Sequence, residues 1–327
     1  MQIRSNFAAQ QSANKRNSVL LIGAVTLLLA ALGFTIGYGT TGAVEGAFGV
    51  TTGAIILAML LSVGSYFAGD KLVLGASGAK EVTQQVAPQL MNVVQEISLA
   101  AGTPMPKVYI IDDTAPNAFA TGRDPKHASI AITTGLLQKL DREELQGVIA
   151  HELGHVRNFD IRFALLVAVL VGSIALLADF FLRFTFWGGG RSRGGDRDRG
   201  GGGLAAILFI VAIVLAIVAP IVARMVQLAV SRQREYLADA TSVELTRNPR
   251  GLERALAKIA GDREVLEVAN RATQHLYFTN PIKKFEERST SMFSTHPAIV
   301  DRINRLRQLT GEPPLVESDV RALAGLD

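Results

Sequence analysis

Long uncharged stretches alternate with polar segments along the chain. Residues 19–38, 47–69 and 204–223 carry no charged side chain, and residues 163–182 carry one, Asp179. A transmembrane helix needs about 20 predominantly apolar residues to cross the hydrocarbon core of a bilayer. The pattern therefore predicts two transmembrane helical hairpins, each made of two neighbouring apolar stretches.

The polar segment after the first hairpin carries shorter patterns. Residues 89–101 predict a helix that ends at glycine, and residues 107–112 have the β-branched and aromatic content of a strand. Residues 117–121 and 129–133 flank a turn-like segment, which predicts a β-hairpin with a loop of about five residues. Its first strand is either an edge that holds an extended peptide by main-chain hydrogen bonds or a plain structural strand beside the core.

Composition agrees with a membrane protein. Of the 327 residues, 49% are hydrophobic and 19% are charged, and the mean hydropathy is +0.28. The chain has no cysteine, which excludes disulfides, a cysteine nucleophile and thiolate metal ligands. The net charge of +4 is modest. We attribute it to basic residues near the lipid surface and expect no nucleic-acid partner.

Basic residues give the predicted hairpins an orientation. Arg4, Lys15 and Arg16 precede the first hairpin and Lys71 follows it, which puts both flanks in the cytoplasm by the positive-inside rule. The loop at 188–203 is rich in glycine and arginine and lies outside if both later stretches span. Either this short loop is tolerated there, or the second hairpin only dips into the membrane and leaves its loop cytoplasmic.

One polar segment contains a pattern with catalytic chemistry, His-Glu-Leu-Gly-His at residues 151–155. Asp141 followed by Glu144 is typical of a capping box, so the pattern is predicted to lie on a helix. His151 and His155 then share one helix face and can bind one zinc ion, while Glu152 can take a proton from a water that the zinc activates. With only 5 histidines in the chain, a chance pairing of two surface histidines is a poor explanation.

A catalytic zinc takes three protein ligands and leaves one position open. We expect Glu235 to be the third ligand, because two predicted membrane crossings separate it from His155 and return the chain to the same side. Asp239 follows one helical turn later and is placed to accept an N–H from a zinc-bound histidine. The alternative is that Glu235 and Asp239 solvate a helix face or pair with Arg232 and Arg234.

With these residues, the chain resembles the HtpX family of membrane-bound zinc metalloproteases, which is related to the CAAX prenyl proteases. The resemblance covers nearly the whole chain, including both predicted hairpins. Its two metal motifs are His-Glu-Leu-Gly-His at 151–155 and Ser-Arg-Gln-Arg-Glu-Tyr-Leu-Ala-Asp at 231–239. It also includes Asn-Ala-Phe-Ala at 117–120, and Thr-His-Pro at 295–297 followed by Arg302.

The resemblance implies an endopeptidase that cleaves misfolded or damaged membrane proteins in envelope quality control. Its partners would be polypeptide substrates and the lipid bilayer, and its place a prokaryotic cell (inner) membrane that it crosses several times, with the catalytic domain on the cytoplasmic side. The sequence does not define an oligomeric state.

The resemblance also implies roles for individual residues. One Zn²⁺ per chain would be held by His151, His155 and Glu235, with Glu152 as general base and then acid. The substrate-binding edge would be formed by Asn117, Ala118 and Phe119. His296 has two alternative roles, which are to stabilise the oxyanion or to pack and cap before Pro297.

The expected fold class is a mostly α-helical integral membrane protein with a zincin-like α+β metalloprotease domain, which carries a small β-sheet, and two transmembrane helical hairpins. The expected organisation begins with a cytoplasmic tail at 1–18 and the first hairpin at 19–69. The protease domain comes in two parts, at 70–160 with the zinc helix and at 227–327. The second hairpin lies between them at 161–226, around the Gly/Arg-rich loop at 188–203.

Three other functions fit the sequence less well. An intramembrane zinc protease would have an apolar helix around the metal motif, whereas here charged residues flank it on both sides, from Asp141 to Asp160. A prenyl-protein-type protease is closer, but such enzymes are expected to be longer and to have more membrane spans. A non-catalytic scaffold with structural zinc is disfavoured because such sites are usually closed by four ligands, often thiolates.

Overall fold

The computed structural model describes residues 2–167, 232–262, 297–316 and 319. The chain divides into two compact units. One consists of the described parts of Met1–Lys15, Ala68–Leu165 and Gln227–Asp327, and the other of those of Arg16–Phe67 and Leu166–Val226. Residues 168–226 of the predicted second hairpin, with its Gly/Arg-rich loop, and His296 lie outside the described residues.

Two long helices form most of the described part of the second unit, while the first residues of one (2–15) and the last of the other (68–76) belong to the first unit. Helix α1 spans Gln2–Thr41 and α2 spans Val44–Ala76, so residues 2–18, expected as a tail, are the start of a helix. A Cβ at Gly33 would lie 2.8 Å from Ala54 Cβ, and one at Gly37 would lie 2.7 Å from Ala47 Cα. The two glycines therefore let α1 and α2 approach closely, as small residues do in membrane helix pairs.

Helix α2 also meets the criteria for a membrane span. Among the helices in the described residues, it alone is long and apolar enough to cross a bilayer, with a mean hydropathy of 2.0 over its most apolar 18-residue window. This agrees with one half of the predicted first hairpin.

The unit with the candidate site contains a small mixed sheet in the order β1-β2-β4-β3. The strands are Lys80–Glu81, Lys107–Ile111, Ala118–Gly122 and Ala128–Thr133 for β1 to β4. Strands β3 and β4 are antiparallel and pair Gly122 with Ala128, and the 3-10 helix η1 (Pro125–His127) lies in their connection. The predicted β-hairpin is confirmed, and its first strand lies at an edge of the sheet.

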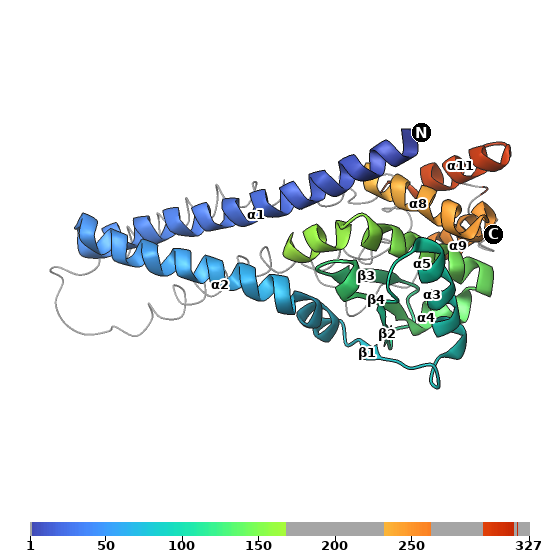
Figure 1. The fold of residues 1–327 in the computed structure, drawn as a ribbon, viewed down its shortest axis with the longest axis horizontal. Helices are drawn as coiled ribbons and strands as arrows, with labels where there is room; N and C mark the ends of the chain where they lie inside the picture. The colour runs from blue at the N-terminus through green and yellow to red at the C-terminus, as the bar shows by residue number, and fades with distance from the viewer. Residues whose placement is uncertain (1, 168–231, 263–296, 317–318, 320–327) are drawn as a thin grey trace, which may run out of the picture. The chain divides into compact units, whose positions relative to one another are not determined.

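The helices labelled in Figure 1 that belong wholly to this unit are α3 (Pro88–Ala101), α4 (Thr134–Lys139), α5 (Arg142–Arg157), α8 (Arg232–Thr246), α9 (Pro249–Gly261) and α11 (Ile299–Thr310). Their ends follow the sequence signals. Helix α3 ends at Gly102 and α11 at Gly311, both with left-handed backbone angles. The capping box of Asp141 and Glu144 starts α5 as predicted.

Helix α5 is the centre of this unit because α3, α8, α9 and β3 all pack against it. Its apolar side joins one core with residues of the sheet and of α3, α9 and α11, including Val94, Ile130, Val148 and Leu256. A Cβ at Gly147 of α5 would lie 2.7 Å from the backbone nitrogen of Leu252 in α9. Glycine is therefore required for the close approach of these two helices.

The observed fold agrees in part with the expected class. The described residues are mostly helical and carry a small β-sheet next to the helix that bears the His-Glu-Leu-Gly-His motif. The presence of two complete transmembrane hairpins stays a prediction.

Candidate metal centre

Helix α5 brings two imidazoles together. His151 and His155 are one turn apart, and their Nε2 atoms lie 3.2 Å from each other. The side chain of His151 is fully buried, and that of His155 is 15% exposed. Because both Nε2 atoms face the same point, the two rings can share one cation.

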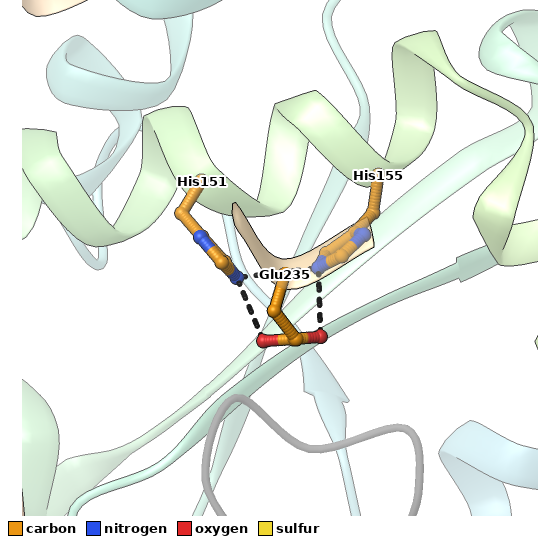
Figure 2. A group of neighbouring side chains, drawn as sticks. All are labelled: His151, His155 and Glu235. Carbon is orange, nitrogen blue, oxygen red and sulfur yellow. Dashed lines mark hydrogen bonds and ion pairs between the residues drawn. The ribbon is translucent and has the colours of Figure 1, made fainter. Parts of the chain in front are cut away.

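Helix α8 supplies the carboxylate of Glu235 to the same point (Figure 2). Its Oε2 lies 3.7 Å from His151 Nε2, and its Oε1 lies 3.6 Å from His155 Nε2. The approach of α8 depends on Gly154, at which a Cβ would lie 3.2 Å from Ala238 Cα. The glycine inside the histidine motif therefore lets α8 come close enough for Glu235 to reach the histidines.

The spacing of these three groups fits a zinc ion. One ligand atom from each of His151, His155 and Glu235 lies within 4.8 Å of the others. Two nitrogens at the usual zinc distance of roughly 2.05 Å and a tetrahedral angle would be about 3.3 Å apart, close to the 3.2 Å between the two Nε2 atoms. Imidazole and carboxylate are also donors that zinc accepts. The residues therefore fit a metal of this kind.

A carboxylate touches the other nitrogen of each ring. Asp239 Oδ1 lies 2.9 Å from His151 Nδ1, and Asp160 Oδ2 lies 3.0 Å from His155 Nδ1. A carboxylate at Nδ1 favours the tautomer with a proton there, which leaves the lone pair of Nε2 for a metal. Asp239 was expected in this role, whereas Asp160 was not.

Arg302 of α11 is the largest fully buried side chain in the site and was not expected to touch it. Its guanidinium donates two hydrogen bonds to Asp239, at 2.9 and 2.6 Å. Its Nη1 lies 3.5 Å from Glu235 Oε2. Arg302 therefore supplies positive charge among the acidic groups and fixes Asp239 against His151.

Glu152 lies beside the histidines, in contact with the sheet edge. Its carboxylate accepts a hydrogen bond from the backbone N–H of Ala120 in β3. The Oε1 atom is buried and has no hydrogen-bond partner in the part of the chain that the structure describes. Burial raises the pKa of Glu152 to about 7, against the opposing charge of His155. A buried acceptor of this kind suits a carboxylate that receives a proton.

In the absence of a metal, the surrounding protein groups shift the pKa values of the two imidazoles in opposite directions. Burial and the nearby charge of Arg302 lower the pKa of His151 to about 4. Burial would also lower the pKa of His155, but its hydrogen bond with Asp160 and the charge of Glu235 outweigh burial and raise the pKa to about 9. A cation that binds His155 must therefore displace a proton.

The predicted substrate residues lie at the start of the edge strand. Asn117 directly precedes β3, and its backbone N–H donates to Thr133 Oγ1 at 2.9 Å. Its side-chain Oδ1 accepts the N–H of Ala118 at 3.0 Å. Asn117, Ala118 and Phe119 are all buried, so a peptide can pair with this edge only once the edge is uncovered.

The residues that sequence reasoning missed have weak sequence signals. Asp160 follows His155 by five residues, beyond the end of α5, so helical spacing does not connect them. Arg302 belongs to a segment that supported the family resemblance, but no spacing rule links α11 to the histidines. Asn14, which contacts Asp160, lies in a segment without a clear pattern. These contacts depend on tertiary structure.

Comparison with known proteins gives one family. Residues 84–310 match the model of Peptidase family M48. The chain is 44% identical over 300 residues to a "Protease HtpX homolog" of Streptococcus uberis, a match that covers 92% of this chain and 99% of that protein. It is also 44% identical to a "Protease HtpX homolog" of Thermoanaerobacter pseudethanolicus, over 92% of this chain and 97% of that one.

A search of solved structures finds the crystal structure of S. mikatae Ste24p. The match has a TM-score of 0.46 and 16% sequence identity, and it covers 91% of this chain and 67% of that one.

Proposed function

Because the chain belongs to peptidase family M48, with HtpX proteases as its relatives, and is a metallopeptidase, we propose that it is a zinc-dependent endopeptidase. His151, His155 and Glu235 hold the zinc, and Glu152 is the general base and then the general acid. The observation that carries this proposal is the convergence of two Nε2 atoms and one carboxylate on a single point, with the buried Glu152 adjacent.

Zinc bound there supplies a Lewis acid that polarises the scissile carbonyl and makes a water molecule more acidic. Glu152 accepts a proton at Oε1 from the attacking water and then delivers it to the leaving amine. The Ala120 N–H holds the Glu152 carboxylate while the proton moves. Asp239 and Asp160 hold the two imidazoles by their Nδ1 atoms. His296, outside the described residues, is the candidate for stabilising the oxyanion.

We assign substrate binding to the edge strand β3 and to Asn117 before it. An extended peptide can add to a sheet edge by main-chain hydrogen bonds once that edge is uncovered. This edge adjoins Glu152 through Ala120, so a peptide bound along it would have its backbone near the general base. Since main-chain pairing does not depend on one side-chain sequence, the arrangement favours unfolded polypeptides as substrates.

The proposed substrates are misfolded or damaged membrane proteins, and the proposed location is a prokaryotic cell membrane. The apolar helix α2 supports membrane attachment. Basic residues on both sides of the first hairpin support a cytoplasmic catalytic unit.

The proposal is tested by cleavage of an unfolded protein by the full-length enzyme, purified in detergent and supplied with zinc. Glu152→Gln keeps the shape of the side chain but cannot accept the proton, and we expect a loss of at least about 100-fold in the cleavage rate. Glu143→Gln is the matched control, because Glu143 lies on the same helix and is exposed.

We expect Glu143→Gln to cleave the unfolded protein at the wild-type rate. A chelator should abolish cleavage by the wild type and by Glu143→Gln. Cleavage by Glu152→Gln at the wild-type rate would refute the role of Glu152. Zinc binding without cleavage by any of the proteins would favour a non-catalytic scaffold.

A further inference from the structure

The first turns of α1 reach the carboxylate that holds His155. Asn14 Nδ2 donates to Asp160 Oδ1 at 2.6 Å and to the backbone oxygen of Asn158 at 2.9 Å. The other oxygen of Asp160 lies 3.0 Å from His155 Nδ1. Asn14 is fully buried and Asp160 nearly so. One carboxylate therefore connects the amino-terminal helix to a candidate metal ligand.

Asn158, Phe159 and Asp160 form the turn after α5, and α1 also contacts its middle residue, Phe159. Phe159, between Asn158 and Asp160, has a φ of 59°, in the left-handed region that costs free energy for a residue with a Cβ. The Lys15 ammonium lies 4.6 Å from the centre of the Phe159 ring, within the range of a cation–π contact. Two consecutive residues of α1 thus contact three consecutive residues of the turn.

Asp160 also has a cationic neighbour on α8. Arg234 Nε lies 3.6 Å from Asp160 Oδ1, the oxygen that also accepts from Asn14. Arg234 directly precedes Glu235 on α8. The Asp160 carboxylate is therefore held by α1 and α8 on one oxygen, which leaves Oδ2 for His155.

We propose that Asn14 is a positioning residue for His155, so that metal binding depends on the docking of the amino-terminal segment of α1. The inference rests on the metal site proposed above. Asn14 provides two donors from one rigid amide, and together they fix both the direction of the Asp160 carboxylate and the turn that carries it. Without Asn14, Asp160 can rotate away and the His155 ring loses its fixed orientation.

This role makes the metal site depend on the amino-terminal helix α1. Helix α1 is continuous from Gln2 to Thr41, and its apolar part begins at Val19, only five residues after Asn14. Asn14 and Lys15, in the segment expected as a tail, therefore contact the turn that carries Asp160.

The test compares Asn14→Ala with the control Asn17→Ala, in the full-length protein purified in detergent. Asn17 is on the same helix, and its replacement leaves the Asn14–Asp160 hydrogen bond in place. Both changes are made in a Glu152→Gln background, which prevents self-cleavage. The zinc dissociation constant is measured by competition with a chelator. The visible absorption of Co²⁺ bound in place of zinc is recorded as well, because it reports the geometry of the ligands.

We expect Asn14→Ala to weaken zinc binding about 10-fold, at the lower end of the effect of groups that orient metal ligands, and to change the Co²⁺ spectrum. Asn17→Ala should leave both unchanged. Asn14→Ser, which keeps a polar side chain too short for both acceptors, is measured as well, so that misfolding of one variant leaves the other decisive.

Unchanged affinity and spectrum in the Asn14 variants would overturn this inference alone, provided that His155→Ala abolishes binding. If His155→Ala binds zinc as tightly as its parent, the proposed metal site itself is wrong.

Discussion

At the scale of single residues, the candidate site is a set of charges held by one another. Asp239 lies between His151 and the guanidinium of Arg302, and all three are buried. A buried charge is tolerated only when paired and hydrogen-bonded. Arg302 and Asp239 therefore support each other as well as the metal ligands, and the fold depends on this pair even without a metal.

Replacement of Asp239 tests this dependence. Asp239→Ala leaves Arg302 with the Glu235 carboxylate, whose Oε2 lies 3.5 Å from Arg302 Nη1. Loss of one member of a buried pair costs about 3 kcal/mol or more. We expect a lower free energy of unfolding in detergent, measured with a chelator present. Removing the buried charge as well, in Asp239→Ala with Arg302→Met, should recover part of the loss.

The control for this comparison is Asp301→Ala, because Asp301 is an exposed residue of α11 next to Arg302. It should unfold like the wild type. If Asp239→Ala were as stable as Asp301→Ala, the Asp239–Arg302 pair would not be important for the fold.

At the scale of elements, the sequence signals were strongest where the chemistry is local. The capping box at Asp141, the glycine after α3 and the hairpin from β3 to β4 are each specified by a few neighbouring residues, and each was predicted. The start of α1 was not, because residues 2–18 show no clear apolar period. Asn14 and Ser18 of this segment are buried polar residues, so its helix depends on tertiary contacts.

The same distinction applies to the site. The i, i+4 spacing of His151 and His155 specifies their shared face. The pairing of α5 with α8 and α9 depends on glycines whose role appears only in three dimensions, such as Gly147 against Leu252. Neither Asp160 nor Arg302 could be linked to the histidines by spacing alone, because the turn after α5 and the packing of α11 bring them there.

At the scale of the whole molecule, the expected membrane topology puts two exposed positions, Ala43 and Thr83, on opposite sides of the membrane. Ala43 lies in the connection between α1 and α2, and Thr83 lies between β1 and α3, both exposed. If the first hairpin spans the membrane with its flanks in the cytoplasm, Ala43→Cys should react with an impermeant thiol reagent on intact cells. Thr83→Cys should react only after the cells are opened.

The absence of native cysteine gives this labelling a clean background. Reaction of Thr83→Cys in intact cells, with Ala43→Cys protected, would reverse the proposed orientation. Reaction of both would argue against a spanning hairpin.

The proposed zinc site takes three ligands from two distant segments of the chain, and X-ray absorption of zinc bound to Glu235→Cys tests this ligand set most directly. Because the chain has no other cysteine, a sulfur in the first coordination shell can come only from position 235. We predict one sulfur at about 2.3 Å from zinc. Glu244→Cys, on the exposed side of the same helix, should show only nitrogen and oxygen neighbours. Zinc bound by Glu235→Cys without a sulfur neighbour would contradict the proposed ligand set.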